Sequence, residues 1–144
     1  MDNKLNVLFL CTGNSCRSQM AEGFARFYHE EKMNAYSAGI EKHGMNPLAI
    51  KVMAEKEIDI TSHSSKTVDE LDVRFDLVIT VCGHADESCP VFPDQTKVVH
   101  IGFDDPPKLA KDAASEEEAL VHYRRVRDEI SQSIRLINLS ELIA

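Results

Sequence analysis

Four cysteines and an arginine stand at spacings that could support chemistry. Cys11 and Arg17 enclose five residues, and Cys82 and Cys89 enclose six. An arginine can hold two oxygens of an anion with its guanidinium group, and a cysteine beside it is a candidate nucleophile. Cysteines in a reducing compartment are more often catalytic or metal-binding than structural. Four roles are therefore open for Cys11: a packing residue, a metal ligand, a phosphatase nucleophile or an electron donor.

The segment from Cys11 to Arg17 predicts an anion-binding loop, because it follows an apolar run and precedes a helical pattern. Backbone N–H groups in such a loop can turn inward toward an oxyanion. Gly13 permits the positive φ that the curl needs, and Asn14 tolerates it. We expect the positive field of Arg17 to lower the pKa of Cys11, so that this cysteine is a thiolate. The predicted oxyanion-binding residues are Thr12, Gly13, Asn14, Ser15, Cys16, Arg17 and Ser18.

The elements that must position these residues alternate between strands and helices. Apolar runs predict strands at 5–10, 34–40, 75–81 and 97–103. Helical patterns occupy 18–32, 46–58 and 65–72, and one long amphipathic helix contains Leu120 to Ile137, whereas 82–94 reads as a loop and 104–108 as a turn. This alternation predicts one α/β domain over residues 1–144, a three-layer sandwich with a four-stranded parallel sheet and helices on both faces.

Parallel sheets bind their ligands outside the carboxyl ends of the strands. Cys11 follows the first predicted strand, Cys82 follows the third, and Asp104 and Asp105 follow the fourth. We therefore expect these three segments, far apart in sequence, to meet at one edge of the sheet.

The composition excludes several classes of partner. The chain has 144 residues and a net charge of −8, which argues against binding to nucleic acid or to an anionic membrane. An anionic substrate must then be attracted by a local positive field. No apolar run is long enough to span a membrane, and the first residues do not read as a signal peptide, so we expect a cytoplasmic protein. We also expect it to be a monomer.

The segment VLFLCTGNSCRSQMAEG (7–23) resembles the active-site segment of the low-molecular-weight protein tyrosine phosphatase fold. It resembles more closely that of the thioredoxin-coupled arsenate reductases built on this fold. The resemblance continues through YSAGI (36–40), VITVCGHADESCPVFP (78–93) and HIGFDDP (100–106), and so spans nearly the whole chain.

The second pair of cysteines separates the two activities. A phosphatase needs neither Cys82 nor Cys89, whereas arsenate reduction takes two electrons, which two thiols supply when they form a disulfide. The resemblance implies that Cys11 attacks arsenate, that Arg17 and the loop amides hold the oxyanion, and that phosphate or sulfate can occupy the same loop. It further implies a Cys11–Cys82 disulfide, then a Cys82–Cys89 disulfide that thioredoxin reduces, with Cys16 in a supporting role.

The resemblance also implies that Asp105 is the general acid, because it directly precedes Pro106. Asp104 is the rival candidate. Related phosphatases place an aromatic residue after this proline, whereas Pro107 stands here and the chain has no tryptophan. The alternative hypothesis is nevertheless a phosphatase that uses Cys11, Arg17 and Asp105, and slow hydrolysis of small phosphate esters is expected as a side activity.

A Cys82–Cys89 disulfide places a constraint on the residues between them. A disulfide needs Cα atoms about 5.5 Å apart, whereas residues seven apart on a helix are separated by about 10.5 Å. Segment 82–92 must therefore be a loop or become one. We predict that it changes conformation on oxidation and carries the disulfide outward to a reductant protein.

The cysteines, histidines and carboxylates could in principle form two kinds of metal site. Zinc bound by Cys11, Cys82, Cys89 and a histidine such as His84 is not predicted, because C-x6-C lacks the short spacing of most zinc sites. A thiol protein that only binds metal or arsenite would need neither Arg17 nor Asp105. Some arsenate reductases of this type hold potassium near the loop. Three of the matching positions are Asn14, Glu22 and Ser37. The position of a further acidic ligand is taken here by Ser65 and Lys66, neither of which is acidic, so a tight potassium site is not predicted.

Overall fold

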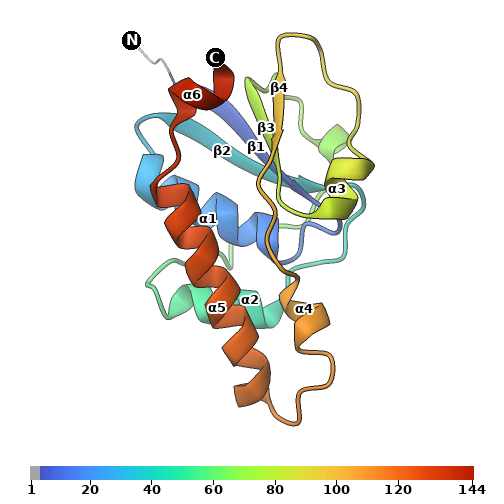
Figure 1. Ribbon diagram of the computed structural model, residues 1–144, viewed down its shortest axis with the longest axis vertical. Helices are drawn as coiled ribbons and strands as arrows, with labels where there is room; N and C mark the ends of the chain where they lie inside the picture. The colour runs from blue at the N-terminus through green and yellow to red at the C-terminus, as the bar shows by residue number, and fades with distance from the viewer. Residues whose placement is uncertain (1–3) are drawn as a thin grey trace.

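An open sheet of four parallel strands carries the loops on which the cysteines lie (Figure 1). The computed structural model of the protein describes residues 4–144. In chain order the elements are β1 (Leu5–Cys11), α1 (Arg17–His29), β2 (Met33–Gly39), α2 (Pro47–Ala54), the 3₁₀ turn η1 (Val68–Glu70), β3 (Leu77–Thr80), α3 (Gly83–Glu87), β4 (Lys97–His100), α4 (Pro106–Leu109), α5 (Glu116–Arg135) and α6 (Leu139–Ile143). The strand order is β2-β1-β3-β4, and each neighbouring pair is parallel.

Strand β1 lies inside the sheet because its sequence is apolar on both faces. Val7 to Cys11 are all buried, and β1 pairs with β2 on one side and β3 on the other. Consecutive parallel strands that are buried on both faces require crossover connections, which the helices and loops between them supply. The cysteine loop therefore begins at the end of a central strand.

Contacts from neighbouring positions show that both faces of the sheet are covered. Ser37, which pairs with Phe9, donates its hydroxyl to Glu22 of α1 at 2.6 Å, so α1 covers that face. Thr80 pairs with Leu10, and the side chains of both point to the opposite face of the sheet. The hydroxyl of Thr80 donates to Asp86 of α3 at 3.3 Å, so α3 covers that face. The predicted parallel α/β sandwich with helices on both faces is confirmed.

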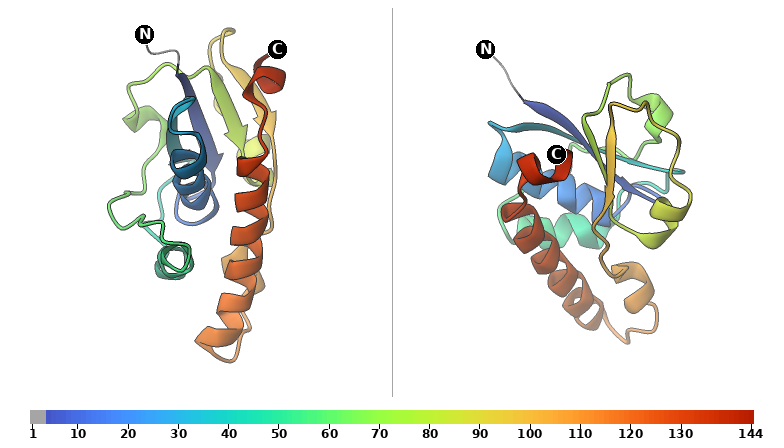
Figure 2. Two further views of the ribbon diagram at one scale, coloured as in Figure 1. Left: turned by 90° about the vertical axis from the view of Figure 1, so that its left-hand side faces the viewer. Right: turned by 45° about the horizontal axis from the view of Figure 1, so that its top comes forward.

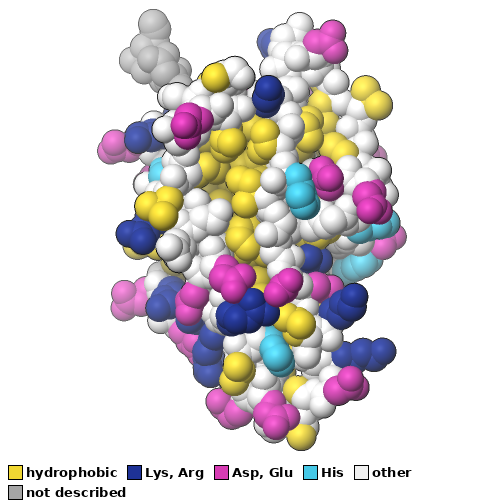
Figure 3. Space-filling model, in the orientation of Figure 1, with side chains coloured by type: hydrophobic (Ala, Val, Ile, Leu, Met, Phe, Trp, Pro, Cys, Tyr) yellow, Lys and Arg dark blue, Asp and Glu magenta, His cyan; other side chains and the backbone are white. Residues whose placement is uncertain are grey.

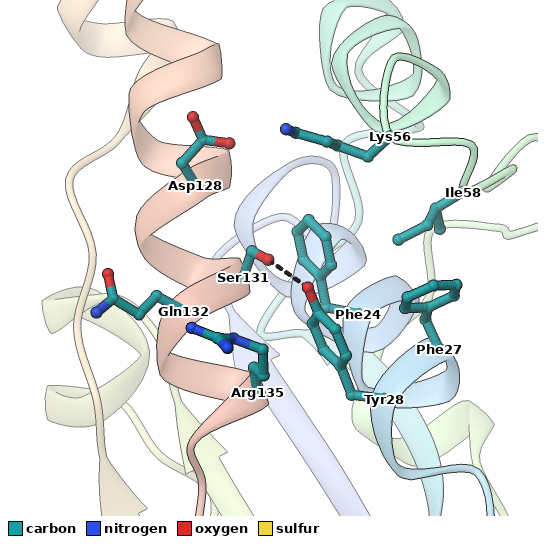
Figure 4. Close-up of a pocket in the computed structure, with 9 residues that line it drawn as sticks. All are labelled: Phe24, Phe27, Tyr28, Lys56, Ile58, Asp128, Ser131, Gln132 and Arg135. Atoms are coloured by element: carbon teal, nitrogen blue, oxygen red, sulfur yellow. Dashed lines mark hydrogen bonds between the residues drawn. The ribbon is translucent and has the colours of Figure 1, made fainter.

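Helix α5 packs against α1 and extends beyond the sheet toward α2 and α4 (Figures 1 and 2). A pocket of about 300 Å³ lies between α5, α1 and the chain after α2, and there Tyr28 and Ser131 are hydrogen-bonded at 2.8 Å (Figure 4). This pocket is lined from the second half of α1, several turns away from the cysteine loop at the other end of that helix. Among residues 4–144, no helix is long and apolar enough to cross a membrane.

Several predicted boundaries were wrong. Segment 82–94 contains the short helix α3, because the sulfur of Cys82 accepts the N–H of Ala85 and closes its first turn. The predicted turn at 104–108 contains α4, since prolines fit the first positions of a helix. The long C-terminal helix ends at Arg135, and Asn138 caps a separate helix, α6. The helix predicted at 65–72 shrinks to η1.

Candidate active site

The three predicted segments meet beyond the carboxyl ends of the strands. Cys11 ends β1, Cys82 lies two residues beyond β3, and Phe103 to Asp105 follow β4. Contacts join them: the hydroxyl of Thr12 lies 3.3 Å from the sulfur of Cys82, and Arg17 donates to the carbonyl of Phe103 at 3.0 Å. The expected convergence at one edge of the sheet is present.

A strap of residues 40–46 fixes the outer side of the cysteine loop. Its backbone N–H groups donate to the carbonyls of Cys11, Thr12, Gly13 and Ser15 at 2.9–3.1 Å. Because the C=O and the following N–H of a planar peptide point in opposite directions, the amides of the next residues face away from the strap. Within residues 4–144, the amides of 13–18 donate to no protein acceptor outside the helix. They are therefore available to bind an oxyanion.

The tight turn of the loop is made by Asn14, whose φ is +50°. Its side chain donates to Ser18 at 2.8 Å and accepts from Gln19 at 3.0 Å and from the amide of Lys66 at 2.9 Å. Gly13, expected to supply the positive φ, is needed for a different reason. A Cβ at this position would lie 2.1 Å from the ring of His43 in the strap.

Arg17 lies between the loop and the segment after β4. Its side chain is only 12% exposed, and one terminal nitrogen lies 3.7 Å from the carboxylate of Asp105. Asp104 points elsewhere and pairs with Arg125 of α5 at 3.0 Å. The structure therefore places Asp105, and not Asp104, beside the anion-binding arginine.

The thiols of Cys11 and Cys82 contact each other and share a proton unequally. The hydrogen bond to Cys82, together with burial, raises the pKa of Cys11. The hydrogen bond from Cys11, with others from Thr12 and the amide of Ala85, lowers the pKa of Cys82 to about 5. The charge of Arg17 lowers the pKa of Cys11, as expected, but the hydrogen bond with Cys82 and burial outweigh it. The same contact favours the thiolate form of Cys82, which also accepts the N–H of Ala85 at the start of α3.

The other two cysteines are thiols with raised pKa values. Burial raises the pKa of Cys16 to about 12. Burial, and then the charge of Asp86, raises the pKa of Cys89, which is half-buried beyond α3. All four cysteines are free, and α3 separates Cys82 from Cys89. A bond between these two therefore requires a change in α3.

Sequence reasoning missed several residues that build the site. The Thr12 hydroxyl contacts Cys82, and the Ser18 hydroxyl accepts a hydrogen bond from Asn14, two contacts that the spacing of the loop does not indicate. Gln19 and the 40–46 strap were not singled out at all. The 40–46 strap gives little signal because it acts through backbone N–H groups, and Gln19 gives little because its side-chain amide contacts Asn14, His63 and Ser64 in a pattern that spacing does not reveal.

The residues at the positions that match the potassium site of the family lie close together, but their partners leave no room for a free cation. Glu22 is buried, accepts the hydroxyl of Ser37 at 2.6 Å and is paired with Arg26 at 2.8 Å. The ammonium of Lys66 lies 3.4 Å from the carbonyl of Ser37. The carboxylate of Glu22 is thus already paired with Arg26, and the Ser37 carbonyl already accepts the ammonium of Lys66, so a further cation would be repelled.

Comparison with known proteins agrees with this geometry. Residues 6–142 match the family model of low molecular weight phosphotyrosine protein phosphatase. The chain is 52% identical to an arsenate reductase of Halalkalibacterium halodurans over 92% of this chain and 94% of that protein. It is 51% identical to arsenate reductase 1 of Bacillus cereus over 94% and 95% of the two chains.

Solved structures show the same similarity. An arsenate reductase in its oxidised state superposes with a TM-score of 0.73 at 30% identity, covering 99% of this chain and 97% of that one. An arsenate reductase in its phosphate-binding state gives 0.70 at 31% identity, with 90% and 93% covered. The chain therefore belongs to the low molecular weight phosphotyrosine protein phosphatase family and, within it, to the group of the arsenate reductases.

Proposed function

We propose that the protein reduces arsenate to arsenite by a relay of three cysteines, Cys11, Cys82 and Cys89, and that thioredoxin regenerates it. The observation that carries this proposal is the contact between Cys11, in an anion-binding loop, and Cys82, whose pKa is lowered to about 5. A phosphatase has no use for a second, activated sulfur beside its nucleophile. A reductase needs one to remove the first sulfur from arsenic.

In the first step, the sulfur of Cys11 adds to arsenic while the loop amides and Arg17 hold the other oxygens. A sulfur–arsenic bond forms and one arsenic–oxygen bond breaks. The proton of the Cys11 thiol passes through Asp105 to the departing hydroxyl oxygen, which leaves as water. The position of Asp105, 3.7 Å from Arg17, supports this role, because the acid and the anion-binding group then face the same oxyanion.

In the second step, the thiolate of Cys82 attacks the sulfur of Cys11. The disulfide forms as the sulfur–arsenic bond breaks, and the electron pair of that bond stays on arsenic, which leaves as arsenite. The short distance between the Thr12 hydroxyl and Cys82, 3.3 Å, supports this step, because the hydroxyl stabilises the attacking thiolate.

In the third step, Cys89 attacks Cys82 and frees Cys11. The resulting Cys82–Cys89 disulfide is reduced by the dithiol of thioredoxin, which supplies the two electrons that arsenic received. Cys89 suits an outgoing position because it follows the short helix α3 and is half-buried. Val91, two residues further on, is fully exposed.

The second candidate function is phosphatase activity. Cys11, Arg17 and Asp105 form a set that would serve phosphate-ester hydrolysis as well. A solved arginine phosphatase superposes with a TM-score of 0.69 at 25% identity, covering 91% of both chains. This activity would need neither Cys82 nor Cys89, which separates the two functions experimentally.

The deciding experiment measures arsenate-dependent consumption of NADPH in the presence of thioredoxin and thioredoxin reductase. The wild type is expected to turn over repeatedly, and Cys89→Ser is expected to stop after a single equivalent of arsenite. The neighbouring Ser88→Ala is the matched control and should behave as the wild type. Hydrolysis of p-nitrophenyl phosphate by Cys89→Ser reports whether the loop is intact. Repeated turnover by Cys89→Ser would contradict the relay, and no turnover by the wild type would contradict arsenate reduction itself.

A further inference from the structure

A buried carboxylate with several cationic neighbours lies beneath the anion-binding loop. Glu22 of α1 is 4% exposed, and its two oxygens are occupied by the hydroxyl of Ser37 at 2.6 Å and by Arg26 at 2.8 Å. His63 lies 3.8 Å away. A charge this deeply buried needs local compensation. The cluster is more elaborate than a single surface ion pair.

Lys66 enters this cluster from the segment after α2. Its ammonium group donates to the carbonyl of Ser37 at 3.4 Å. The direct ion pair of Glu22 is with Arg26 at 2.8 Å, and Lys66 lies near enough for the charge of Glu22 to act on it. Burial lowers the pKa of Lys66, while the charge of Glu22 acts in the opposite direction. The side chain is half-buried, although a free lysine would extend into water.

The backbone of Lys66 also holds the loop. Its N–H donates to the side-chain oxygen of Asn14 at 2.9 Å, and its carbonyl accepts the N–H of Gly39 at 2.8 Å. Asn14 is the residue with φ +50° at the tight turn of the loop. One residue therefore connects the charge of Glu22 to the conformation of the anion-binding loop.

We propose that the ammonium of Lys66 acts together with Arg26 as a built-in counter-ion for Glu22, so that no free cation is needed there, and that Lys66 is a positioning residue for the anion-binding loop. The oxygens that would serve potassium are already engaged. The Asn14 oxygen accepts two N–H groups, and the Ser37 carbonyl accepts the ammonium. A tethered cation is always present, so oxyanion binding by this protein does not depend on potassium.

The test measures binding of inorganic phosphate by calorimetry and the temperature of thermal unfolding, each in potassium chloride and in choline chloride at equal ionic strength. The wild type is expected to give the same values in both salts. Lys66→Met should bind phosphate about tenfold more weakly, the change that about 1.4 kcal/mol produces. Lys51→Met is the matched control, because Lys51 forms a surface pair with Glu116 at 2.8 Å, and it should leave phosphate affinity unchanged.

A second variant tests the position of the charge. Lys66→Asp replaces the ammonium with a carboxylate, so it should unfold at a higher temperature and bind phosphate more tightly in potassium than in choline. The proposal is overturned if the wild type responds to potassium specifically, if Lys66→Met binds phosphate as Lys51→Met does, or if folded Lys66→Asp shows no preference for potassium. None of these measurements requires arsenate reduction, so failure here is distinct from failure of the proposed function.

Discussion

Thr12 is one of the residues that make the two neighbouring cysteines differ, after the hydrogen bond between the two sulfurs themselves. Cys11 and Cys82 are both buried, and the charge of Arg17 lowers the pKa of both. Only the sulfur of Cys82 has the hydroxyl of Thr12 beside it, at 3.3 Å. A hydrogen bond to the charged form of a group stabilises that form. The difference in pKa between the two sulfurs therefore depends in part on Thr12, which lies in the loop of Cys11 but contacts Cys82.

Replacing Thr12 with valine should raise the pKa of Cys82 above its value of about 5. The acidic limb of the pH profile for disulfide formation should move to higher pH, because a lower fraction of Cys82 is then thiolate at acidic pH. Rates of alkylation by iodoacetamide across the pH range measure this shift directly. Thr12→Ser keeps the hydroxyl and should stay close to the wild type. An unchanged profile for the valine variant would show that Thr12 does not activate Cys82.

The two neighbouring aspartates differ in their partners and should differ in their effects. Asp105 lies beside Arg17, whereas Asp104 is exposed and pairs with Arg125. Asp105→Asn should slow the first turnover of arsenate by roughly 10²-fold or more, the usual contribution of a general acid. Thiol exchange among the cysteines should be unaffected, because it does not break an arsenic–oxygen bond.

Single-turnover formation of arsenite measures this step, and exchange with an added disulfide measures the other. Asp104→Asn is the matched control, and it should retain the rate of the first step. If Asp104→Asn showed the larger defect, the assignment of the acid would be wrong.

Helix α3 is the element on which the relay depends. It has five residues, and the sulfur of Cys82 accepts the N–H of Ala85 at its start, at 3.4 Å. Helices this short are marginal without such contacts. Thr80 and His100, hydrogen-bonded to each other at 2.8 Å, lie against Asp86 from the adjoining strands. The start of α3 is thus held by the sulfur of Cys82, which the proposed reaction oxidises to a disulfide.

Oxidation should therefore unwind α3. When Cys82 bonds to Cys89, its sulfur no longer caps the helix, and the two Cα atoms must come within about 5.5 Å. The amides of Asp86 and Ser88, which donate to Cys82 and His84 at 3.1 Å and 2.9 Å, should lose protection. Hydrogen exchange of the reduced and oxidised protein measures this, with α1 as the unaffected reference. Retained protection in protein with a Cys82–Cys89 bond verified by mass spectrometry would contradict the prediction.

The elements show what sequence can and cannot predict. The apolar run of β1 and the Asn46–Pro47 start of α2 are local signals, and the structure has both, with Asn46 accepting two amides. Helix α3 has no such signal, since five residues are too few for a helical period and its cap is a sulfur. The break before α6 was hidden by apolar spacing that runs through Leu136, although Asn138 is an ordinary cap.

The same limit applies to the site. The cysteines and Arg17 stand out by type and spacing, whereas the choice of Asp105 over Asp104 comes from the resemblance to the family. The lowered pKa of Cys82 depends on its contact with Cys11 and in part on that with Thr12, both about seventy residues away in sequence. Contacts over this range leave no local pattern in the sequence. The sequence therefore indicates only that Lys66 replaces an acidic residue, and not that its ammonium lies near Glu22.

At the scale of the whole molecule, the surface charge and the short edge strand β4 both disfavour association with a second copy. Hydrophobic side chains gather in the hollow between α6 and β4, whereas charged side chains cover the lower half of α5 (Figure 3). Strand β4 is an edge of the sheet, but it has only four residues and begins with an exposed Lys97. Short and charged edge strands resist pairing with another copy.

The protein should therefore be a monomer of 16.2 kDa in solution. A net charge of −8 makes two copies repel each other. The edge strand β4 has only four residues and begins with a charged one, so it offers few backbone groups for pairing with a strand of another copy. Sedimentation equilibrium over a wide range of protein concentration, at low ionic strength and at an ionic strength of about 0.15 M, measures the mass. The mass should stay constant at both, because the edge of β4 still resists pairing when salt screens the net charge. A mass that rises with concentration at either ionic strength would contradict the prediction, and would identify the hollow beside β4 as the first surface to mutate.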